Sequence, residues 1–293
     1  MNDFTLRYDT YLSEFEAYAK SYAETLKTRP KILGESMLYT LMNGGKRIRP
    51  VLMLACADVV GVSHEEVLPF ALALEMLHTY SLIHDDLPAM DNDDFRRGQP
   101  SSHKQFGEDN AVLAGDALQN EAYAICIQQC LKGENCVRAA AFLNECAGIY
   151  GMIAGQSADI YFSKEKNEYS EEDLSYVYEH KTGKLLLASV VLPSILAGNK
   201  SFFALEKFGK LLGLLFQATD DILDATGSFQ EVGKTLGKDS KENKLTCLRL
   251  YGLEGAKIRV DLCAEDCCAV LEGIEGDVSF LNAIVEFVRN RTY

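Results

Sequence analysis

Two clusters of aspartates, each at the end of an apolar segment, are the residues of this chain whose types and spacing could do chemistry. They lie in the sequences DDLPAMD and DDILD, and they comprise Asp85, Asp86 and Asp91 in the first and Asp220, Asp221 and Asp224 in the second. Residues four apart share one face of a helix, so Asp220 and Asp224 project together. Crowded carboxylates among apolar side chains are costly unless a cation offsets them. A divalent metal ion is the natural occupant.

Ligands that are all oxygens favour a hard cation. Mg²⁺ usually takes one or two carboxylates and completes its shell with water and substrate phosphate, so two clusters predict a diphosphate held between them. An EF-hand is excluded, because Phe95 stands where the stretch from Asp91 would need a ligand. One such cluster alone would as often be a solvated helix end. Two clusters, both embedded in apolar sequence and followed by basic residues, favour metal binding.

The elements that carry these aspartates are predicted to be helices. The chain has 6 prolines and no tryptophan, and its Ala/Leu/Glu-rich segments place apolar residues three and four apart, while β-branched runs are too short for a sheet. Helix starts are indicated by a capping box, Ser63 with Glu66, and by a looser version, Ser170 with Asp173. Pro88 should end or kink the first aspartate helix, so that Asp91 folds back toward the same metal. A glycine-rich loop is expected over residues 227–237.

Length and composition favour one domain and exclude several classes of protein. No linker rich in Pro, Gly or Ser divides the 293 residues, so residues 1–293 are expected to form a single all-helical domain. A net charge of -14 argues against nucleic acid as a partner. The nine cysteines lack zinc or disulfide spacing, which together with a non-signal N-terminus predicts a cytoplasmic protein. The longest apolar stretch, residues 185–198, is too short to be a transmembrane segment and is interpreted as a core helix.

Basic residues form a second set of candidate ligands. In GGKRIRP, Lys46 and Arg49 are three apart at the expected start of a helix, where both can face a phosphate; the stretch does not match a P-loop. His78 shares a helical face with Asp85, although alone it would be interpreted as a core histidine. Other cations are scattered near the acidic motifs, and they include Arg96, Arg97, Lys181, Lys234 and Lys244. Together they suffice for two diphosphates, which means two substrates.

The combined motifs resemble those of the trans-polyprenyl diphosphate synthases. Over residues 40–250 the chain carries GGKRIRP, HTYSLIHDDLPAMD, RRG, HKTG, FQATDDILD and GKTLGKD, and the resemblance is close to the short-chain bacterial farnesyl diphosphate synthases. The resemblance implies an all-α fold of the isoprenoid synthase type, a single large helical bundle around a deep central cavity. It also implies a homodimer that condenses isopentenyl diphosphate head-to-tail with an allylic diphosphate, dimethylallyl or geranyl diphosphate.

The resemblance also implies roles for individual residues. The six aspartates would hold three Mg²⁺, with Mn²⁺ as a substitute. The isopentenyl diphosphate site would comprise Lys46, Arg49, His78 and Arg97, and the allylic site Arg96, Lys181, Thr182, Gln217, Lys234 and Lys244. The catalytic set would be Asp85, Asp86, Asp91, Arg96, Lys181, Thr182, Gln217 and Asp220. Pyrophosphate would leave, the isopentenyl double bond would attack the allylic cation, and a proton would then be lost to the departed pyrophosphate.

Product length is expected to depend on Tyr80 and Ser81. They lie about one turn, roughly 5 to 7 Å, before Asp85 on the path of a growing hydrocarbon tail. In similar enzymes an aromatic residue at the position of Tyr80, with the insertion of Pro88 and Ala89, goes with a fifteen-carbon product, and a small residue permits twenty carbons. Farnesyl diphosphate is therefore the expected product, and geranylgeranyl or geranyl diphosphate is the alternative.

Two further classes remain as alternatives. A terpene cyclase or squalene synthase would share the helices and aspartates but would not need the GGKRIRP site. A non-catalytic partner subunit of a prenyl synthase would tend to lose aspartates, and none is missing here. The chain departs from the family after Lys244, where Leu245 and Thr246 precede Cys247. Its basic C-terminus matches the family only loosely, so Arg289 and Arg291 are left out of the predicted site.

Overall fold

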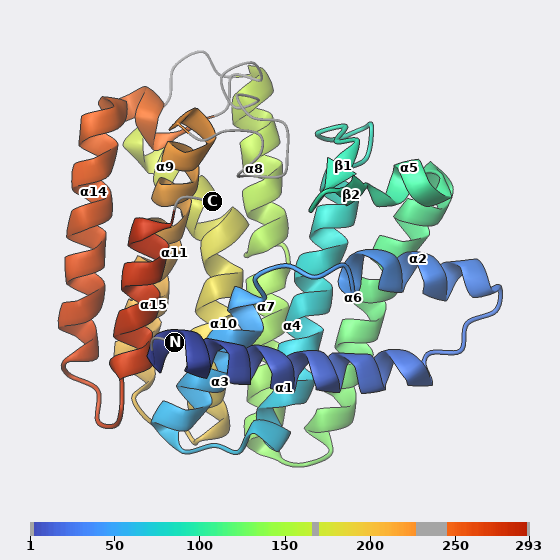
Figure 1. Ribbon diagram of the computed structural model, residues 1–293, viewed down its shortest axis with the longest axis horizontal. Helices are drawn as coiled ribbons and strands as arrows, with labels where there is room; N and C mark the ends of the chain where they lie inside the picture. The colour runs from blue at the N-terminus through green and yellow to red at the C-terminus, as the bar shows by residue number, and fades with distance from the viewer. Residues whose placement is uncertain (1–2, 166–169, 227–244, 292–293) are drawn as a thin grey trace.

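The computed structural model describes residues 3–165, 170–226 and 245–291, and these are almost entirely helical (Figure 1). In chain order the helices are α1 (Asp3–Thr25), α2 (Lys31–Leu41), α3 (Ile48–Val60), α4 (His64–Asp85), α5 (Ser102–Phe106), α6 (Glu108–Cys130), α7 (Glu134–Ala147), α8 (Met152–Glu165), α9 (Glu171–Val177), the π-helix η1 (Tyr178–Gly183), α10 (Lys184–Leu196), α11 (Phe202–Thr226), α14 (Cys247–Leu271) and α15 (Ser279–Asn290). The predicted all-α class is confirmed. The expected glycine-rich loop over residues 227–237 lies outside the described residues.

A small hairpin departs from the prediction that the chain forms no sheet. The strands β1 (Phe95–Arg96) and β2 (Gln99–Pro100) pair antiparallel, with Phe95 opposite Pro100. Arg97 and Gly98 form the turn between them, and both have positive φ. Two residues per strand are too few to leave a pattern of alternating polarity in the sequence, so this hairpin could not be predicted from periodicity.

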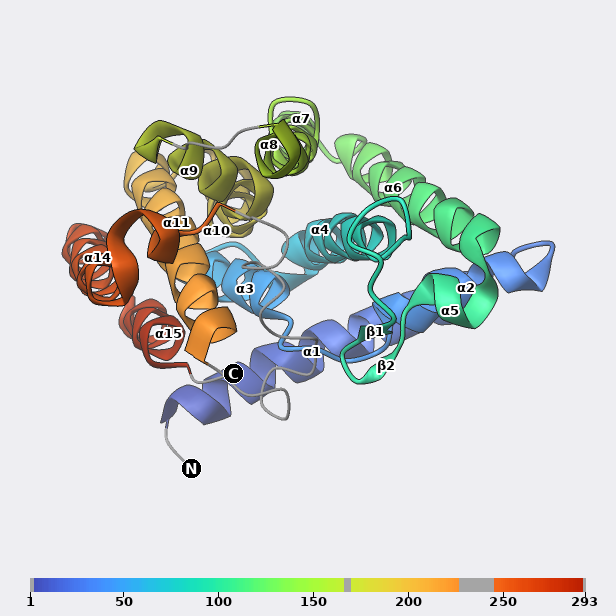
Figure 2. The same ribbon diagram turned by 90° about the horizontal axis from the view of Figure 1, so that it is seen from above.

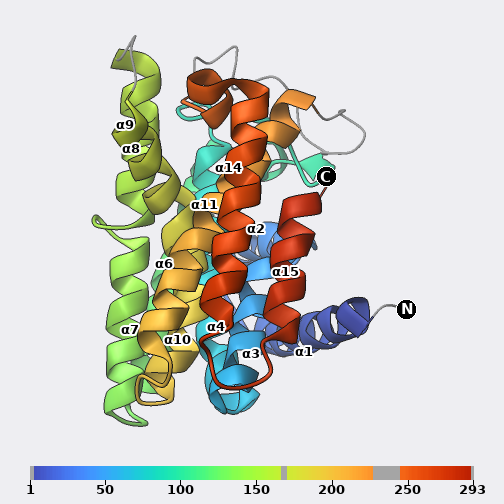
Figure 3. The same ribbon diagram turned by 90° about the vertical axis from the view of Figure 1, so that its left-hand side faces the viewer.

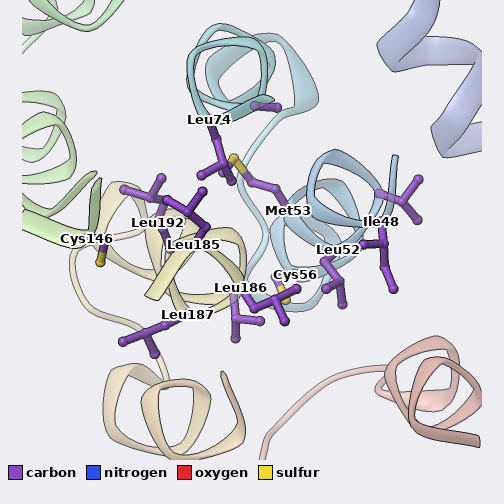
Figure 4. Close-up of a cluster of buried hydrophobic side chains, with 14 of the residues drawn as sticks. Ile48, Leu52, Met53, Cys56, Leu74, Cys146, Leu185, Leu186, Leu187 and Leu192 are labelled. Carbon is purple, nitrogen blue, oxygen red and sulfur yellow. The ribbon is translucent and has the colours of Figure 1, made fainter. Parts of the chain in front are cut away.

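Helices α3, α4 and α10 lie in the middle of the molecule, and the other helices surround them (Figure 2). α4 packs on α3, α6 and α10, while α10 also packs on α7 and α11. The core between these helices is built from leucine, methionine and cysteine side chains, among them Met53, Leu74 and Leu186 (Figure 4). Because α4 and α10 are apolar on nearly all sides, burial around their whole circumference is what stabilises them.

α4 is also the one described helix that is long and apolar enough to cross a membrane by length and composition alone. Of its most apolar window, 78% is buried inside the protein, so its apolar surface is already covered by other helices. The segment interpreted as a core helix, residues 185–198, is confirmed as one: it forms most of α10, and Leu186, Val190 and Leu192 are fully buried there.

Both predicted helix starts are present, but the start expected to have the looser cap has the more complete one. The Ser63 hydroxyl accepts a hydrogen bond from the backbone N–H of Glu66 at 3.4 Å at the start of α4. At the start of α9 the capping box is reciprocal, because the Ser170 hydroxyl accepts from the Asp173 N–H and the Asp173 carboxylate accepts from the Ser170 N–H. The shorter helix, α9, has the more complete cap.

We expect Ser170→Ala to lower the free energy of unfolding by about 1 kcal/mol, because it leaves the first N–H groups of α9 without their side-chain acceptor. Ser175, exposed on the same helix, is the matched control, and Ser175→Ala should change stability by less than about 0.5 kcal/mol. Urea unfolding of the two variants measures the difference. Equal stability of both would show that the cap contributes nothing.

Candidate active site

The two predicted aspartate clusters face one pocket. It has a volume of about 350 Å³ and lies between the C-terminal end of α4, the turn after it, α8, η1 and α11. Carboxylates from four of these elements line it: Asp85, Asp91, Asp93, Asp159, Asp220, Asp221 and Asp224. Five of the six predicted aspartates are therefore brought together. Asp93 and Asp159 were not predicted, since neither belongs to a repeated acidic motif.

The turn after α4 folds back as predicted from Pro88. The N–H of Asp91 donates to the carbonyl of Asp85 at 2.9 Å, and the N–H of Asp93 donates to the carbonyl of Asp86 at 3.1 Å. These bonds return the chain over the end of the helix, so Asp91 and Asp93 lie beside Asp85. A proline that cannot continue a helix thus places three carboxylates on one side of the pocket.

Asp86 differs from its neighbours, because it does not line the pocket. It is 1% exposed and accepts hydrogen bonds from the Nε of Arg96 at 3.0 and 3.2 Å. Burial raises the pKa of Asp86 to about 6, while Arg96 opposes that rise. Asp86 was predicted as a metal ligand together with Asp85 and Asp91. In this structure its carboxylate hydrogen-bonds with Arg96, whose side chain does line the pocket, and the role of Asp86 as a metal ligand stays a prediction.

Two of the pocket carboxylates accept hydrogen bonds from groups on other parts of the chain. Asp85 accepts a hydrogen bond from the amide of Gln156 on α8. Asp221 accepts from the hydroxyl of Tyr178 and from the backbone N–H of Cys247, the latter at 2.7 Å. Gln156 and Tyr178 lie 71 and 43 residues from their partners, so no local sequence signal could have identified them.

The donor set fits Mg²⁺. Among residues 3–165, 170–226 and 245–291 no three His, Cys, Asp or Glu side chains are close enough to hold one ion by themselves. Mg²⁺ needs no such cage, because it is commonly bound by one or two carboxylates plus substrate phosphates and water. Oxygen ligands on opposite walls of one pocket match that requirement. Asp85 and Asp91 on one wall, and Asp220 and Asp224 on the other, are the residues that could hold ions on a shared diphosphate.

A second, basic pocket adjoins the first. It has a volume of about 200 Å³, and Arg49, His78 and Phe216 line both pockets. Its remaining lining residues include Lys46, Arg47, Glu75, Arg97, Phe287 and Arg291. The four residues predicted for the isopentenyl diphosphate, Lys46, Arg49, His78 and Arg97, are all here.

The C-terminal arginines separate in the structure. Arg291, left out of the predicted site, is in the basic pocket, where it pairs with Asp220 at 2.6 Å and lies over the ring of Phe216. Arg289 points elsewhere and pairs with Asp261 at 2.7 Å. The loose family match at the chain end could not distinguish two arginines two residues apart. In the structure Arg289 lies in the last turn of α15, whereas Arg291 follows the helix with an extended backbone, and the two reach different partners.

Burial and neighbouring positive charges disfavour the charged forms of the basic residues in this pocket. Loss of hydration lowers the pKa of Lys46, of Arg49 and of Arg97, and for Arg97 the charges of nearby arginines add to it. The pKa of His78 lies well below its usual value, mainly because of burial and then because of Arg49 and other arginines. A multivalent anion in this pocket would favour the charged forms of these side chains and so offset the cost of burying them. The pocket is therefore suited to a diphosphate.

The loop before α3 shapes the basic pocket. Gly44, Gly45 and Arg47 all have positive φ, at 62°, 110° and 49°. A Cβ on Gly45 would lie 2.7 Å from the guanidinium carbon of Arg97, so only glycine lets that arginine reach the carbonyl of Gly44, to which it donates at 2.5 Å. Arg47 is buried and paired at 2.9 Å with Glu75, which is 2% exposed.

A π-helix presents Lys181 and Thr182 to the acidic pocket. Lys181 pairs with Asp159 at 2.6 Å, and the Thr182 hydroxyl donates to the side-chain carbonyl of Gln217 at 2.7 Å. The Gln217 amide in turn donates to Asp221 at 3.2 Å. π-helical turns are rare and are frequent at functional sites. Their widened turn has no sequence signature, so the prediction located these residues but not their geometry.

An apolar cavity of about 530 Å³ adjoins both pockets. It shares Arg49 and His78 with both of them and Asp85 with the acidic pocket. Tyr80 and Ser81 line it, as predicted, together with apolar side chains such as Met152, Ile153, Ile160 and Leu185. Tyr80 is 5% exposed and meets the ring of His84 edge-on at 5.8 Å. Lys234 and Lys244, predicted for the allylic diphosphate, lie outside the described residues.

Comparison with known proteins identifies the family. The sequence profile of the family described as polyprenyl synthetase matches residues 30–265, so the chain belongs to that family. It is a prenyltransferase with the fold of the isoprenoid synthases.

The names of the relatives specify two different products, geranylgeranyl and farnesyl diphosphate. The chain is 40% identical over 293 residues to geranylgeranyl pyrophosphate synthase 4 of Arabidopsis thaliana, covering 96% of this chain and 79% of the relative. It is 39% identical over 277 residues to the farnesyl diphosphate synthase of Bacillus subtilis (strain 168), covering 93% of each. A solved geranyltransferase of Helicobacter pylori, complexed with magnesium and isoprenyl diphosphate, superimposes with a TM-score of 0.85 at 33% identity over 99% of this chain and 97% of that one.

We expect His78 to stay neutral at physiological pH. Because its pKa is lowered in the folded protein, the folded state binds fewer protons than the unfolded chain below pH 6.5, and the free energy of unfolding should fall as the pH drops below that value. NMR titration of the imidazole, assigned with the His78→Gln variant, tests this. A midpoint at or above about 6.5 would contradict the electrostatic account of the basic pocket.

Proposed function

We propose that the chain condenses isopentenyl diphosphate head-to-tail with dimethylallyl or geranyl diphosphate and gives mainly farnesyl diphosphate. One observation carries this proposal: an acidic pocket and a basic pocket adjoin, share Arg49 and His78, and open onto one apolar cavity. Two isoprenoid diphosphates that are joined to one another require two charged sites for their diphosphates and one apolar site for the growing hydrocarbon tail. A cyclase with a single diphosphate substrate gives no reason for the basic pocket.

The acidic pocket is assigned to the allylic diphosphate. Asp85, Asp91, Asp220 and Asp224 would share Mg²⁺, with Asp221 steadied by Tyr178 and Asp86 acting through Arg96. Three ions per site are proposed, and Mn²⁺ as a substitute. When bound, Mg²⁺ supplies positive charge that stabilises the pyrophosphate leaving group. Arg96 and Lys181 would add to that stabilisation from side chains already oriented by Asp86 and Asp159.

The basic pocket is assigned to isopentenyl diphosphate. Lys46, Arg49 and Arg97 would bind its diphosphate, and His78, kept neutral, would donate a hydrogen bond. Since Arg49 and His78 border the acidic pocket as well, this placement brings the isopentenyl double bond toward the allylic carbon. Holding two reactants in register removes much of the entropic barrier to their reaction.

The allylic cation needs oxygen dipoles near it and no water. Thr182 and Gln217 are joined by a hydrogen bond and line the acidic pocket, so their oxygens would be available to steady the cation. The departed pyrophosphate is the proposed acceptor of the final proton. Apolar walls of the adjoining cavity, such as Leu82 and Leu185, would exclude water from the tail.

Geranylgeranyl diphosphate is the second candidate product, since relatives at 40% identity carry that name. Farnesyl diphosphate is favoured here because Tyr80, about one turn from Asp85, lines the apolar cavity with an aromatic ring and would limit the length of the tail. A role as a non-catalytic partner subunit is disfavoured, because all six aspartates are present. We further propose that residues 1–293 act as one domain, in a cytoplasmic homodimer.

The direct test of activity uses purified protein, Mg²⁺, labelled isopentenyl diphosphate and geranyl diphosphate, with chain length read after dephosphorylation. A dominant fifteen-carbon alcohol supports the proposal. A twenty-carbon alcohol keeps the reaction and replaces the product. No elongation by correctly folded protein would favour the partner-subunit alternative.

Asp85→Asn is expected to lower kcat at least about a hundredfold, because it removes charge that would hold Mg²⁺ on the leaving group. The matched control is Asp266→Asn, at an exposed position of α14, which should retain wild-type activity. Circular dichroism confirms folding of both variants. Activity of Asp85→Asn within tenfold of wild type would refute the assignment of the acidic pocket.

Tyr80→Ala is expected to shift the main product to twenty carbons or more, because it removes the cavity-lining ring proposed to limit the growing tail. Tyr80→Phe is the control: it keeps the ring and deletes a hydroxyl that has no hydrogen-bond partner among the described residues. Its main product should stay at fifteen carbons. If Tyr80→Ala gave the same chain lengths as wild type, Tyr80 would not limit the product.

A further inference from the structure

We propose that Tyr8, on α1, is a positioning residue for the second diphosphate: it fixes the backbone of Lys46 so that the loop before α3 keeps the shape of the basic pocket. This inference rests on the proposed function, in which the basic pocket is assigned to isopentenyl diphosphate. Tyr8 does not line the pocket. It would act through Lys46, which does.

The loop needs such support because its conformation is unfavourable on its own. Three of its residues, Gly44, Gly45 and Arg47, have positive φ, and for Arg47 this is a costly conformation. Residues held in such conformations persist only when the surrounding structure determines them. Left unsupported, the loop would exchange among conformations, and binding an anion would have to select one of them.

The loop is anchored from three different elements. Arg97, at the turn between β1 and β2, donates to the Gly44 carbonyl, and Glu75 on α4 pairs with Arg47. The third anchor is Tyr8, whose hydroxyl donates to the Lys46 carbonyl. Of the three, only Tyr8 neither lines the basic pocket nor contributes a charge to it, so its contribution can be removed without changing the field of the pocket.

The same tyrosine belongs to an aromatic cluster that seats the Lys46 side chain. The ring of Tyr8 lies 6.0 Å from that of Phe287 and 6.5 Å from that of Phe280, both on α15. The Lys46 ammonium lies 5.9 Å from the centre of the Phe287 ring, within range of a cation–π interaction. Lys46 is thus held at its carbonyl by α1 and at its ammonium by α15, on the side of the molecule where α1 and α15 meet (Figure 3).

Tyr11 provides a matched control on the same helix. Its hydroxyl also donates to an acceptor on another element, Asp58 of α3, at 2.5 Å, and its ring meets Phe280 edge-on at 5.1 Å. Tyr11→Phe therefore deletes a comparable hydrogen bond in the same aromatic cluster, but none of its recorded contacts is to the loop over residues 44–47.

The experiment compares Tyr8→Phe, Tyr11→Phe and wild type in steady-state elongation, varying each substrate in turn. Tyr8→Phe should raise KM for isopentenyl diphosphate about three- to tenfold, the effect of losing one hydrogen bond, and leave KM for geranyl diphosphate and kcat within about twofold. Tyr11→Phe should leave all three constants at wild-type values. Calorimetric titration with isopentenyl diphosphate in the absence of divalent metal should show the same loss of affinity for Tyr8→Phe alone.

The outcomes separate the inference from the function on which it rests. If wild type elongates neither allylic substrate, the proposed function fails and the role of Tyr8 fails with it. If wild type is active and Tyr8→Phe keeps the wild-type KM and affinity for isopentenyl diphosphate, only the role of Tyr8 is refuted. A fall in kcat for Tyr8→Phe with both KM values unchanged, or an equal rise in KM for isopentenyl diphosphate in Tyr11→Phe, would mark a general structural effect and would also overturn the inference.

Discussion

Charges of like sign crowded into a poorly hydrated centre are the constraint on which this structure depends. Seven carboxylates line one pocket, and a group of arginines with Lys46 lines the next. Like charges within each set repel one another, and four ion pairs in and beside the two pockets offset part of that repulsion. The pairs are Asp86 with Arg96, Asp159 with Lys181, Asp220 with Arg291 and Glu75 with Arg47. Each pair also fixes at least one side chain that lines one of the two pockets.

α4 is the element that organises both pockets and the cavity. Glu75, His78, Tyr80 and Asp85 follow one another along it. Glu75 pairs with Arg47, His78 lines both charged pockets, Tyr80 lines the apolar cavity and Asp85 lines the acidic pocket. Ten residues of helix span about 15 Å, a fixed spacing. Because the helix is buried on nearly all sides, that spacing cannot relax without disturbing the core.

The glycines of the site act by allowing close approach rather than flexibility. A Cβ on Gly155 of α8 would lie 2.0 Å from the backbone nitrogen of Lys181. A Cβ on Gly213 of α11 would lie 2.8 Å from the Cα of Gly183. The π-helix is therefore packed between two helices at backbone contact. This confinement gives Lys181 and Thr182 defined positions, as a preorganised site requires.

Sequence reasoning identified the parts that depend on local pattern. Helix periodicity, the turn at Pro88 and the motif residues Asp85, Lys46 and Arg49 were all readable from short stretches. What it missed depends on contacts far apart in the chain. Gln156 with Asp85 and Arg291 with Asp220 are such contacts, and so is the pairing that turns Asp86 away from the pocket. The positive φ of Arg47 could not be predicted either, because arginine does not prefer this conformation and the contacts that hold the loop, such as the pair with Glu75, come from distant parts of the chain.

The central claim is that two diphosphates bind side by side, one in each pocket. A crystal structure of the protein with Mg²⁺, isopentenyl diphosphate and a non-ionising thio analogue of geranyl diphosphate tests it most directly. The account predicts the analogue's diphosphate between Asp85 and Asp220, and the isopentenyl diphosphate among Lys46, Arg49 and Arg97. Both headgroups between the aspartates, or a basic pocket without diphosphate at saturating substrate, would contradict it.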